Sequence, residues 1–162
     1  VFIGSRANYK NFDECFRILQ SCRDLNLKVV GPDFTPAEKQ LIEPYKNRIQ
    51  IYASVTDETL RNVLAGSQFL FYPSSYEGFG LPIIEAMRLG VPILAKRIPV
   101  FDELFSKYVS FYNHTDDFRD IVRKLFSIRQ RPYPQHEIEF SMHFTWEKSA
   151  HYQINKVREL VG

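Results

Sequence analysis

Two carboxylates flank a glycine-rich turn in the segment Ser75 to Ala86, which reads SYEGFGLPIIEA. Glu77 and Glu85 are separated by seven residues, and Gly78 and Gly80 lie between them. Glycine has no Cβ, so the backbone at such a turn can approach a ligand closely. Carboxylates on both sides of such a turn indicate a binding site rather than core packing.

The same segment contains the start of a predicted helix. Pro82 suits the first helical turn, because its missing N–H would have no partner there. The other amides from Phe79 to Ile84 are expected to be free, and unpaired N–H groups together with the helix dipole attract an anion. Carboxylates beside an anion must face another group, for which neutral hydroxyls are suited. The segment therefore predicts a ligand in which a phosphate is flanked by polyols.

A second loop, Gly4 to Asn11, carries Arg6 and Lys10 between a predicted strand and a predicted helix. Parallel strands end on one side of a sheet, so this loop and the Glu77 loop should face one crevice. Arginine offers a planar fork and lysine a mobile point charge, and both bind phosphate well. Taken alone, the two cations fit an ordinary solvated loop better than a binding site. Opposite an anion site, they favour a phosphate ligand.

Short apolar runs alternate with amphipathic stretches, which indicates an α/β fold with a doubly wound parallel sheet of about six strands. Strands are predicted at 1–4, 27–31, 48–52, 67–72, 91–96 and 108–112, and helices at 11–25, 36–46, 57–65, 81–90, 100–106 and 116–129. The apolar run 68–72 leads directly into the Glu77 segment, at the strand end where open α/β sheets bind ligands. After Pro132 and Pro134, a closing helical segment is predicted with Thr145 as its N-cap.

The 162 residues fit one domain, and 44% of them are hydrophobic, which suffices for a core. A formal charge of +2 is too small to indicate nucleic acid. Cys15 and Cys22 fall on the apolar stripe of the first helix, so we expect reduced core cysteines and a cytoplasmic setting. No apolar run approaches the ~20 residues of a membrane span. Val1 begins in a strand, so we expect a fragment.

The run YPSSYEGFGLPIIEAMRLGVPILA, with the upstream Lys10 loop, resembles the donor-binding half of a retaining glycosyltransferase of the GT-B fold, family 4 (glycosyl transferases group 1). The resemblance extends from Val1 to the predicted helix that begins FTWEKSA at Phe144. It implies that residues 1–162 are the Rossmann-like C-terminal domain, which binds a nucleotide sugar. It also implies that the N-terminal acceptor domain belongs to the same polypeptide outside this chain.

The resemblance implies a role for each matching residue. Glu77 would be the catalytic residue facing the sugar near its anomeric carbon, and Glu85 would accept the ribose hydroxyls. The remaining donor-binding positions are implied to be Arg6, Lys10, Val55, Gly78, Phe79, Gly80 and Leu81. Arg6 matches less closely than Lys10, since many members carry arginine directly after the glycine, where this chain has Ser5.

The implied reaction transfers a hexose from a nucleoside diphosphate sugar, with retention of configuration, to a saccharide or lipid-linked saccharide in polysaccharide or surface-glycan synthesis. No cofactor is expected, since the nucleotide sugar is a substrate. No metal is expected either, because the chain has no Asp-x-Asp and its cations can stabilise the leaving diphosphate. The aromatic content is compatible with peripheral membrane docking of the whole enzyme, but no basic amphipathic helix requires it.

Two other functions fit the same residues. A nucleotide-sugar epimerase or hydrolase would use the same donor site with water or an acid/base pair. A doubly wound module could also bind nucleotide sugars without catalysis, since a fold does not determine a function. Glu77, Glu85 and Lys10 argue against a module used only for protein interactions.

Overall fold

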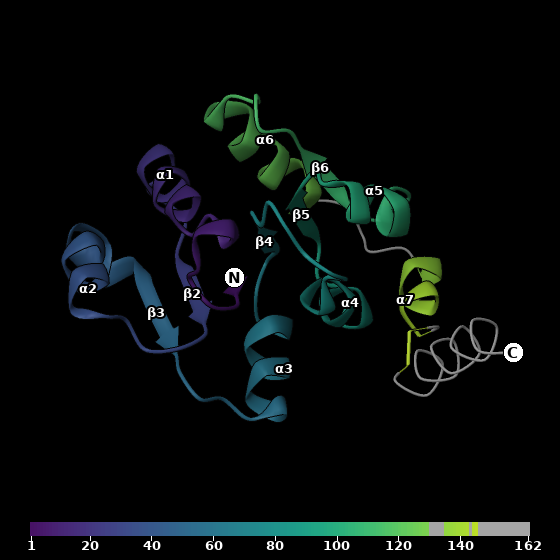
Figure 1. The fold of residues 1–162 in the computed structure, drawn as a ribbon, viewed down its shortest axis with the longest axis horizontal. Coiled ribbons are helices and arrows are strands. Elements are labelled where there is room, and N and C mark those ends of the chain that lie inside the picture. The colour runs from purple at the N-terminus through teal and green to yellow at the C-terminus, as the bar shows by residue number, and fades with distance from the viewer. Residues whose placement is uncertain (130–134, 143, 146–162) are drawn as a thin grey trace, which may run out of the picture.

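The fold is described from a computed structural model that covers residues 1–129, 135–142, 144 and 145 (Figure 1). The helix predicted after Thr145 lies outside these residues. The remaining fold confirms the predicted α/β architecture with parallel strands.

Six short strands form two parallel three-stranded ladders. They are β1 (Phe2–Ile3), β2 (Leu27–Val30), β3 (Ile49–Tyr52), β4 (Leu70–Tyr72), β5 (Ile93–Lys96) and β6 (Ser110–Tyr112). The ladders run β1-β2-β3 and β4-β5-β6. Backbone hydrogen bonds from the Val1 nitrogen to the Phe69 carbonyl at 2.8 Å and from the Phe71 amide to the Val1 carbonyl at 2.9 Å join them. The strand order is therefore β3-β2-β1-β4-β5-β6.

Helices connect the strands close to the predicted positions. They are α1 (Asp13–Ser21), α2 (Pro36–Ile42), α3 (Asp57–Ala65), α4 (Leu81–Arg88), α5 (Pro99–Phe105), α6 (Phe118–Arg129) and α7 (Gln135–Ser141), with 3-10 turns η1 (Asn8–Lys10) and η2 (Glu43–Arg48). Thr35 caps α2 in a capping box with Glu38, and Thr56 caps α3.

Two helix predictions were too long by four residues or more. The predicted helix 36–46 changes to a 3-10 turn at Glu43, because Pro44 has no N–H and its ring clashes with the preceding turn of an α-helix. The predicted helix 11–25 ends at Ser21, where Cys22 becomes extended with φ −140°. Cys15 is buried as predicted, but Cys22 is only half-buried, and both are free thiols.

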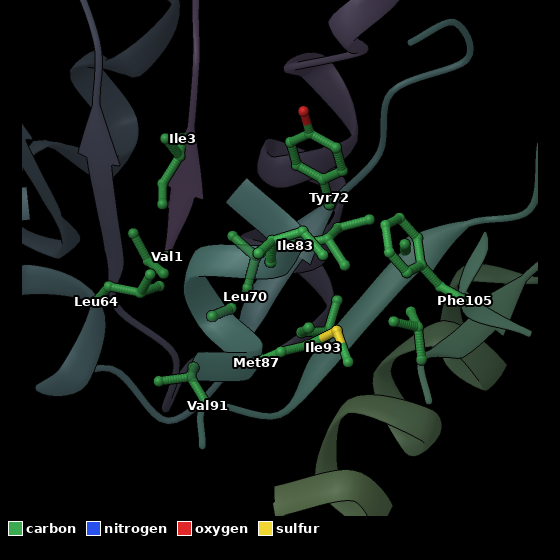
Figure 2. Close-up of a cluster of buried hydrophobic side chains, with 14 of the residues drawn as sticks. Val1, Ile3, Leu64, Leu70, Tyr72, Ile83, Met87, Val91, Ile93 and Phe105 are labelled. Carbon is green, nitrogen blue, oxygen red and sulfur yellow. The ribbon is translucent and has the colours of Figure 1, made fainter. Parts of the chain in front are cut away.

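The helices cover both faces of the sheet (Figure 1). One apolar cluster packs α1 and α6 against one face and includes Phe2, Phe71 and Leu94. The other packs α3, α4 and α5 against the opposite face, and Figure 2 shows part of it around Leu70, Ile83 and Met87. Each fully buried large apolar side chain stabilises the fold by about 1.5–3 kcal/mol. The strands that carry the loops of the site are thus fixed from both sides.

Within the residues that the structure describes, no helix combines the length and apolarity needed to cross a bilayer.

Candidate functional site

The site lies where the strand order changes direction. β1 and β4 are neighbours, but α1 and α4, which follow them, lie on opposite faces of the sheet. Open α/β sheets have their binding crevice at such a point. The two loops that border it are tied together, since Asn11 Nδ2 donates to the Pro73 carbonyl at 2.8 Å and the Ser75 amide donates to the Tyr9 carbonyl at 2.8 Å.

Lys10 and Glu77 meet across this junction. Lys10 Nζ donates to Glu77 Oε1 at 2.5 Å, and the Tyr72 hydroxyl donates to the same oxygen at 2.8 Å. The side chains of Lys10 and Glu77 are 10% and 13% exposed. Burial and the Glu77 charge raise the pKa of Tyr72, so its hydroxyl stays protonated. Figure 2 shows this hydroxyl pointing away from the apolar cluster. The structure thus brings together the two groups predicted from different loops.

The two glycines of the motif have different surroundings. Gly80 has φ +92°, and a Cβ there would lie 2.8 Å from Phe101 Cε1, so only glycine fits. Gly78 has nothing within 4 Å of a Cβ position and lies open above the turn. Phe79 lies between the two glycines, and the centre of its ring is 6.3 Å from the ring centre of Phe105 and 5.3 Å from that of Phe144. The turn is therefore held in place at Phe79 and Gly80, while no described atom covers it at Gly78.

The N-terminus of α4 supplies fewer free amides than the sequence predicts. The Ile83 amide donates to the Gly80 carbonyl at 2.9 Å, which removes it from the expected set. A 3-10 bond of this kind is common in a first helical turn. Gly80, the N-cap, gives no side-chain cap, and Leu81 is 47% exposed beside it. The first turn of α4 is therefore partly exposed and has no capping hydrogen bond from the side chain of its N-cap residue.

Glu85 lines a cavity of about 390 Å³ between α3 and α4. The other lining residues are Asp57, Leu60, Arg61, Leu64, Arg88 and Leu89. Burial and the Asp57 charge raise the pKa of Glu85, while Arg88 opposes the shift. Val55, one of the implied donor-binding positions, is half-buried against the core on this side of the sheet. The cavity joins apolar walls with charges of both signs.

Arg6 binds protein groups in the structure. Its guanidinium donates to both Glu38 carboxylate oxygens, at 2.5 and 3.2 Å, and to the carbonyls of Pro32 and Asp33, each at 2.7 Å. It also lies 4.7 Å from the centre of the Phe34 ring. Hydrogen bonds from Arg6 lower the pKa of Glu38 to about 2. Arg6 thus connects the β1 loop to α2 rather than to Lys10 and Glu77, and its predicted phosphate contact stays a prediction.

Sequence reasoning missed several residues of the site. Asp57 and Arg61 are spaced i, i+4, which puts them on one helix face, and this spacing could have indicated a polar lining. Asn11 bridges the two loops, but nothing in its sequence context distinguishes it. Ser74 is fully buried, and its hydroxyl has no hydrogen-bond partner among the residues described.

The model of the family "Glycosyl transferases group 1" matches residues 1–139. Among relatives, the serotype-specific mannosyltransferase WbdA of Escherichia coli is 28% identical over 95% of this chain and 19% of its own length. The MMP alpha-(1->4)-mannosyltransferase of Mycolicibacterium hassiacum is 37% identical over 51% of this chain and 21% of its own length. The chain thus spans about a fifth of each.

Solved structures share the fold. The sucrose-phosphate synthase of Thermosynechococcus elongatus has a TM-score of 0.79 at 21% identity, over 99% of this chain and 45% of its own. Anabaena Alr3699/HepE, solved in complex with UDP and glucose, has a TM-score of 0.75 at 15% identity, over 98% of this chain and 47% of its own. This chain therefore belongs to the glycosyl transferases group 1 family and has the fold of the GT-B glycosyltransferases.

Proposed function

We propose that this chain is the nucleotide-sugar-binding domain of a retaining, metal-independent hexosyltransferase. The observation that carries the proposal is the pairing of Lys10 with Glu77 at 2.5 Å across the junction of β1 and β4, where the strand order changes direction. The pair lies beside a glycine turn that has open space at Gly78. A phosphate binder and a carboxylate suited to sugar hydroxyls thus lie at one place.

The donor is proposed to lie along the crevice from α3 to the Lys10 loop. Its ribose hydroxyls would donate to Glu85, and its base would enter the cavity near Val55. The diphosphate would take the uncapped amides of Gly80 and Leu81 and the ammonium of Lys10. The sugar would then lie over Gly78 and Phe79, with Glu77 at its edge.

This placement suits departure of a diphosphate. As the bond between the anomeric carbon and phosphate breaks, negative charge grows on the leaving oxygen and positive charge on the sugar. Lys10 and the N-terminus of α4 would stabilise the negative charge on the leaving oxygen, and the Glu77 carboxylate would stabilise the positive charge on the sugar. Because these groups already neutralise the developing charge, we propose that no metal is needed.

The acceptor is proposed to bind a second domain of the same polypeptide, since the chain spans about a fifth of the mannosyltransferases that it matches. Relatives include an O-antigen chain mannosyltransferase of Salmonella typhimurium, 33% identical over 44% of this chain. We therefore propose a saccharide or lipid-linked saccharide acceptor in surface-glycan synthesis, and mannose as the first donor sugar to test.

Isothermal titration with UDP and GDP tests donor binding. We expect one of them to bind the chain, and Glu85→Ala to weaken binding about a hundredfold, because two hydrogen bonds to a charged acceptor are lost. Asp120→Asn, on the solvent face of α6, is the control and should leave affinity unchanged. If neither nucleotide binds, or if Glu85→Ala binds as tightly as the parent, the donor site is misplaced.

Product analysis of the full-length enzyme tests the chemistry. We expect an NMR spectrum in which the new glycosidic bond has the anomeric configuration of the donor, with equal rates in EDTA and in Mg²⁺. An inverted product would contradict the retaining assignment. Release of free sugar only, or conversion to another nucleotide sugar, would favour the hydrolase or the epimerase.

A further inference from the structure

A second buried cluster of lysine, glutamate and tyrosine lies between the start of α1 and the ends of β5 and β6. Lys96 Nζ donates to Glu14 Oε1 at 2.5 Å, and the Tyr112 hydroxyl donates to Glu14 Oε2 at 2.6 Å. The side chains of Lys96 and Glu14 are 8% and 12% exposed. Both oxygens of the Glu14 carboxylate thus accept hydrogen bonds from within the protein.

The cluster connects elements from the two halves of the sheet. Lys96 and Tyr112 are the last residues of β5 and β6 and are paired in register. Glu14 lies in the first turn of α1, which follows β1. In Figure 1, α1 and α6 lie together on one side of the strands. The apolar contacts between these helices and the sheet have no preferred direction. The hydrogen bonds of Glu14 are directional, and they act at the N-terminal end of α1.

Glu14 is also close in sequence to Lys10. Lys10 ends η1, and only Asn11 and Phe12 separate η1 from α1. Asn11 has a left-handed backbone with φ 47°, so the connection is short and sharply turned. The start of α1 is therefore one of the constraints on the Lys10 backbone, together with the Asn11–Pro73 and Ser75–Tyr9 hydrogen bonds that tie its loop to the Glu77 loop.

We propose that Glu14 is a positioning residue. By fixing the start of α1 to Lys96 and Tyr112, it holds Lys10 at the position from which its ammonium binds the diphosphate. The proposal rests on the proposed function, in which Lys10 binds the diphosphate. Glu14 itself touches no part of the donor.

Binding of inorganic pyrophosphate, followed by isothermal titration in a double-mutant cycle, tests the proposal. Lys10→Ala should weaken binding about thirtyfold, and Glu14→Gln about fivefold, as expected for loss and for displacement of a charged hydrogen bond. In the Lys10→Ala background, Glu14→Gln should have no further effect. A role in stability alone would instead give equal effects in both backgrounds, or none.

Glu14→Gln leaves a buried lysine without its counter-ion, and such a protein can fail to fold. Tyr112→Phe is the second variant, because it removes one hydrogen bond without creating an unpaired charge. It should weaken pyrophosphate binding about twofold, again only when Lys10 is present. Asp116→Asn, which breaks the 2.7 Å pair with Lys124 on α6, is the matched control and should not change affinity.

The outcomes separate the two proposals. If Lys10→Ala binds pyrophosphate as well as the parent, the proposed donor site fails. The positioning role is wrong if Lys10→Ala weakens binding but the folded Glu14→Gln and Tyr112→Phe variants bind pyrophosphate like the parent. It is also wrong if these two variants weaken binding by the same factor in the parent and in the Lys10→Ala background.

Discussion

A Cβ added to Gly80 would lie 2.8 Å from Cε1 of Phe101, a side chain with no exposed surface. The fold and the binding turn therefore depend on the same glycine. Phe101 cannot give way easily, since it packs against Tyr72 at 5.8 Å and Phe105 at 6.0 Å between ring centres.

Gly80→Ala is accordingly expected to destabilise the protein by about 2–4 kcal/mol, from the left-handed backbone and the overlap with Phe101 together. Urea unfolding followed by circular dichroism measures this change. Gly78→Ala is the control and should stay within about 0.5 kcal/mol of the parent. Equal stability of the two variants would show that the turn relaxes more easily than the contact indicates.

Glu77→Gln is expected to separate binding from transfer. The Glu77 carboxylate competes with phosphate for Lys10, and its negative charge repels the phosphate. Loss of the Glu77 charge should therefore tighten nucleoside diphosphate binding about threefold to tenfold. Transfer by the full-length enzyme should fall roughly hundredfold or more, since the charge beside the sugar is gone. Titration and initial rates measure the two effects, with Glu58→Gln, on the exposed surface of α3, as the control. Weaker nucleotide binding would show that Glu77 supports Lys10 rather than competing with it.

Glu85→Gln is expected to stabilise the protein near neutral pH while weakening nucleoside binding. The folded pKa of Glu85 is raised, so its ionised form opposes folding at pH values above that pKa. The gain should therefore vanish below the unfolded pKa of 4.5, where the carboxyl is protonated in both states. Urea unfolding at several pH values measures the gain, and a loss of stability near neutral pH would contradict it.

The Arg6–Glu38 pair predicts an acid-sensitive contact. The folded pKa of Glu38 is lowered from 4.5 to about 2, so its contribution to stability is present above 4.5 and is lost as pH falls towards 2. The difference in unfolding free energy between the parent and Glu38→Gln should shrink over that range. Glu43→Gln, from an exposed pair with Lys46, is the control and should show little change. A constant difference for Glu38→Gln would argue that the pair contributes nothing through its charge.

Much of the fold could be predicted because its boundaries depend on local chemistry. Thr56 ahead of an amphipathic run marks the start of α3, and Pro82 and Pro99 mark the first turns of α4 and α5. That the Lys10 loop and the Glu77 loop lie at one edge of the sheet followed from the rule that parallel strands end on one side, but the direct Lys10–Glu77 pair was not predicted. Local signals and topology were enough for the boundaries and for the placement of the two loops.

The rest depends on partners far away in sequence. Arg6 meets Glu38 on α2, 32 residues away, and Glu14 meets Lys96 82 residues away. No periodicity indicates such pairs, because each requires the positions of two helices relative to the sheet. The Ile83 amide was misjudged for a smaller reason, since the sequence does not show whether a first turn tightens into a 3-10 bond.

The empty space above Gly78 offers a way to measure clearance. Because no described protein atom approaches a Cβ there, side chains of increasing size can be placed at this position with little change in the fold. In a series of alanine, serine, valine and leucine, the size at which donor affinity falls would report how far the sugar stands from the backbone. Position 78 would thus convert side-chain size into a measure of the space between the backbone and the bound sugar.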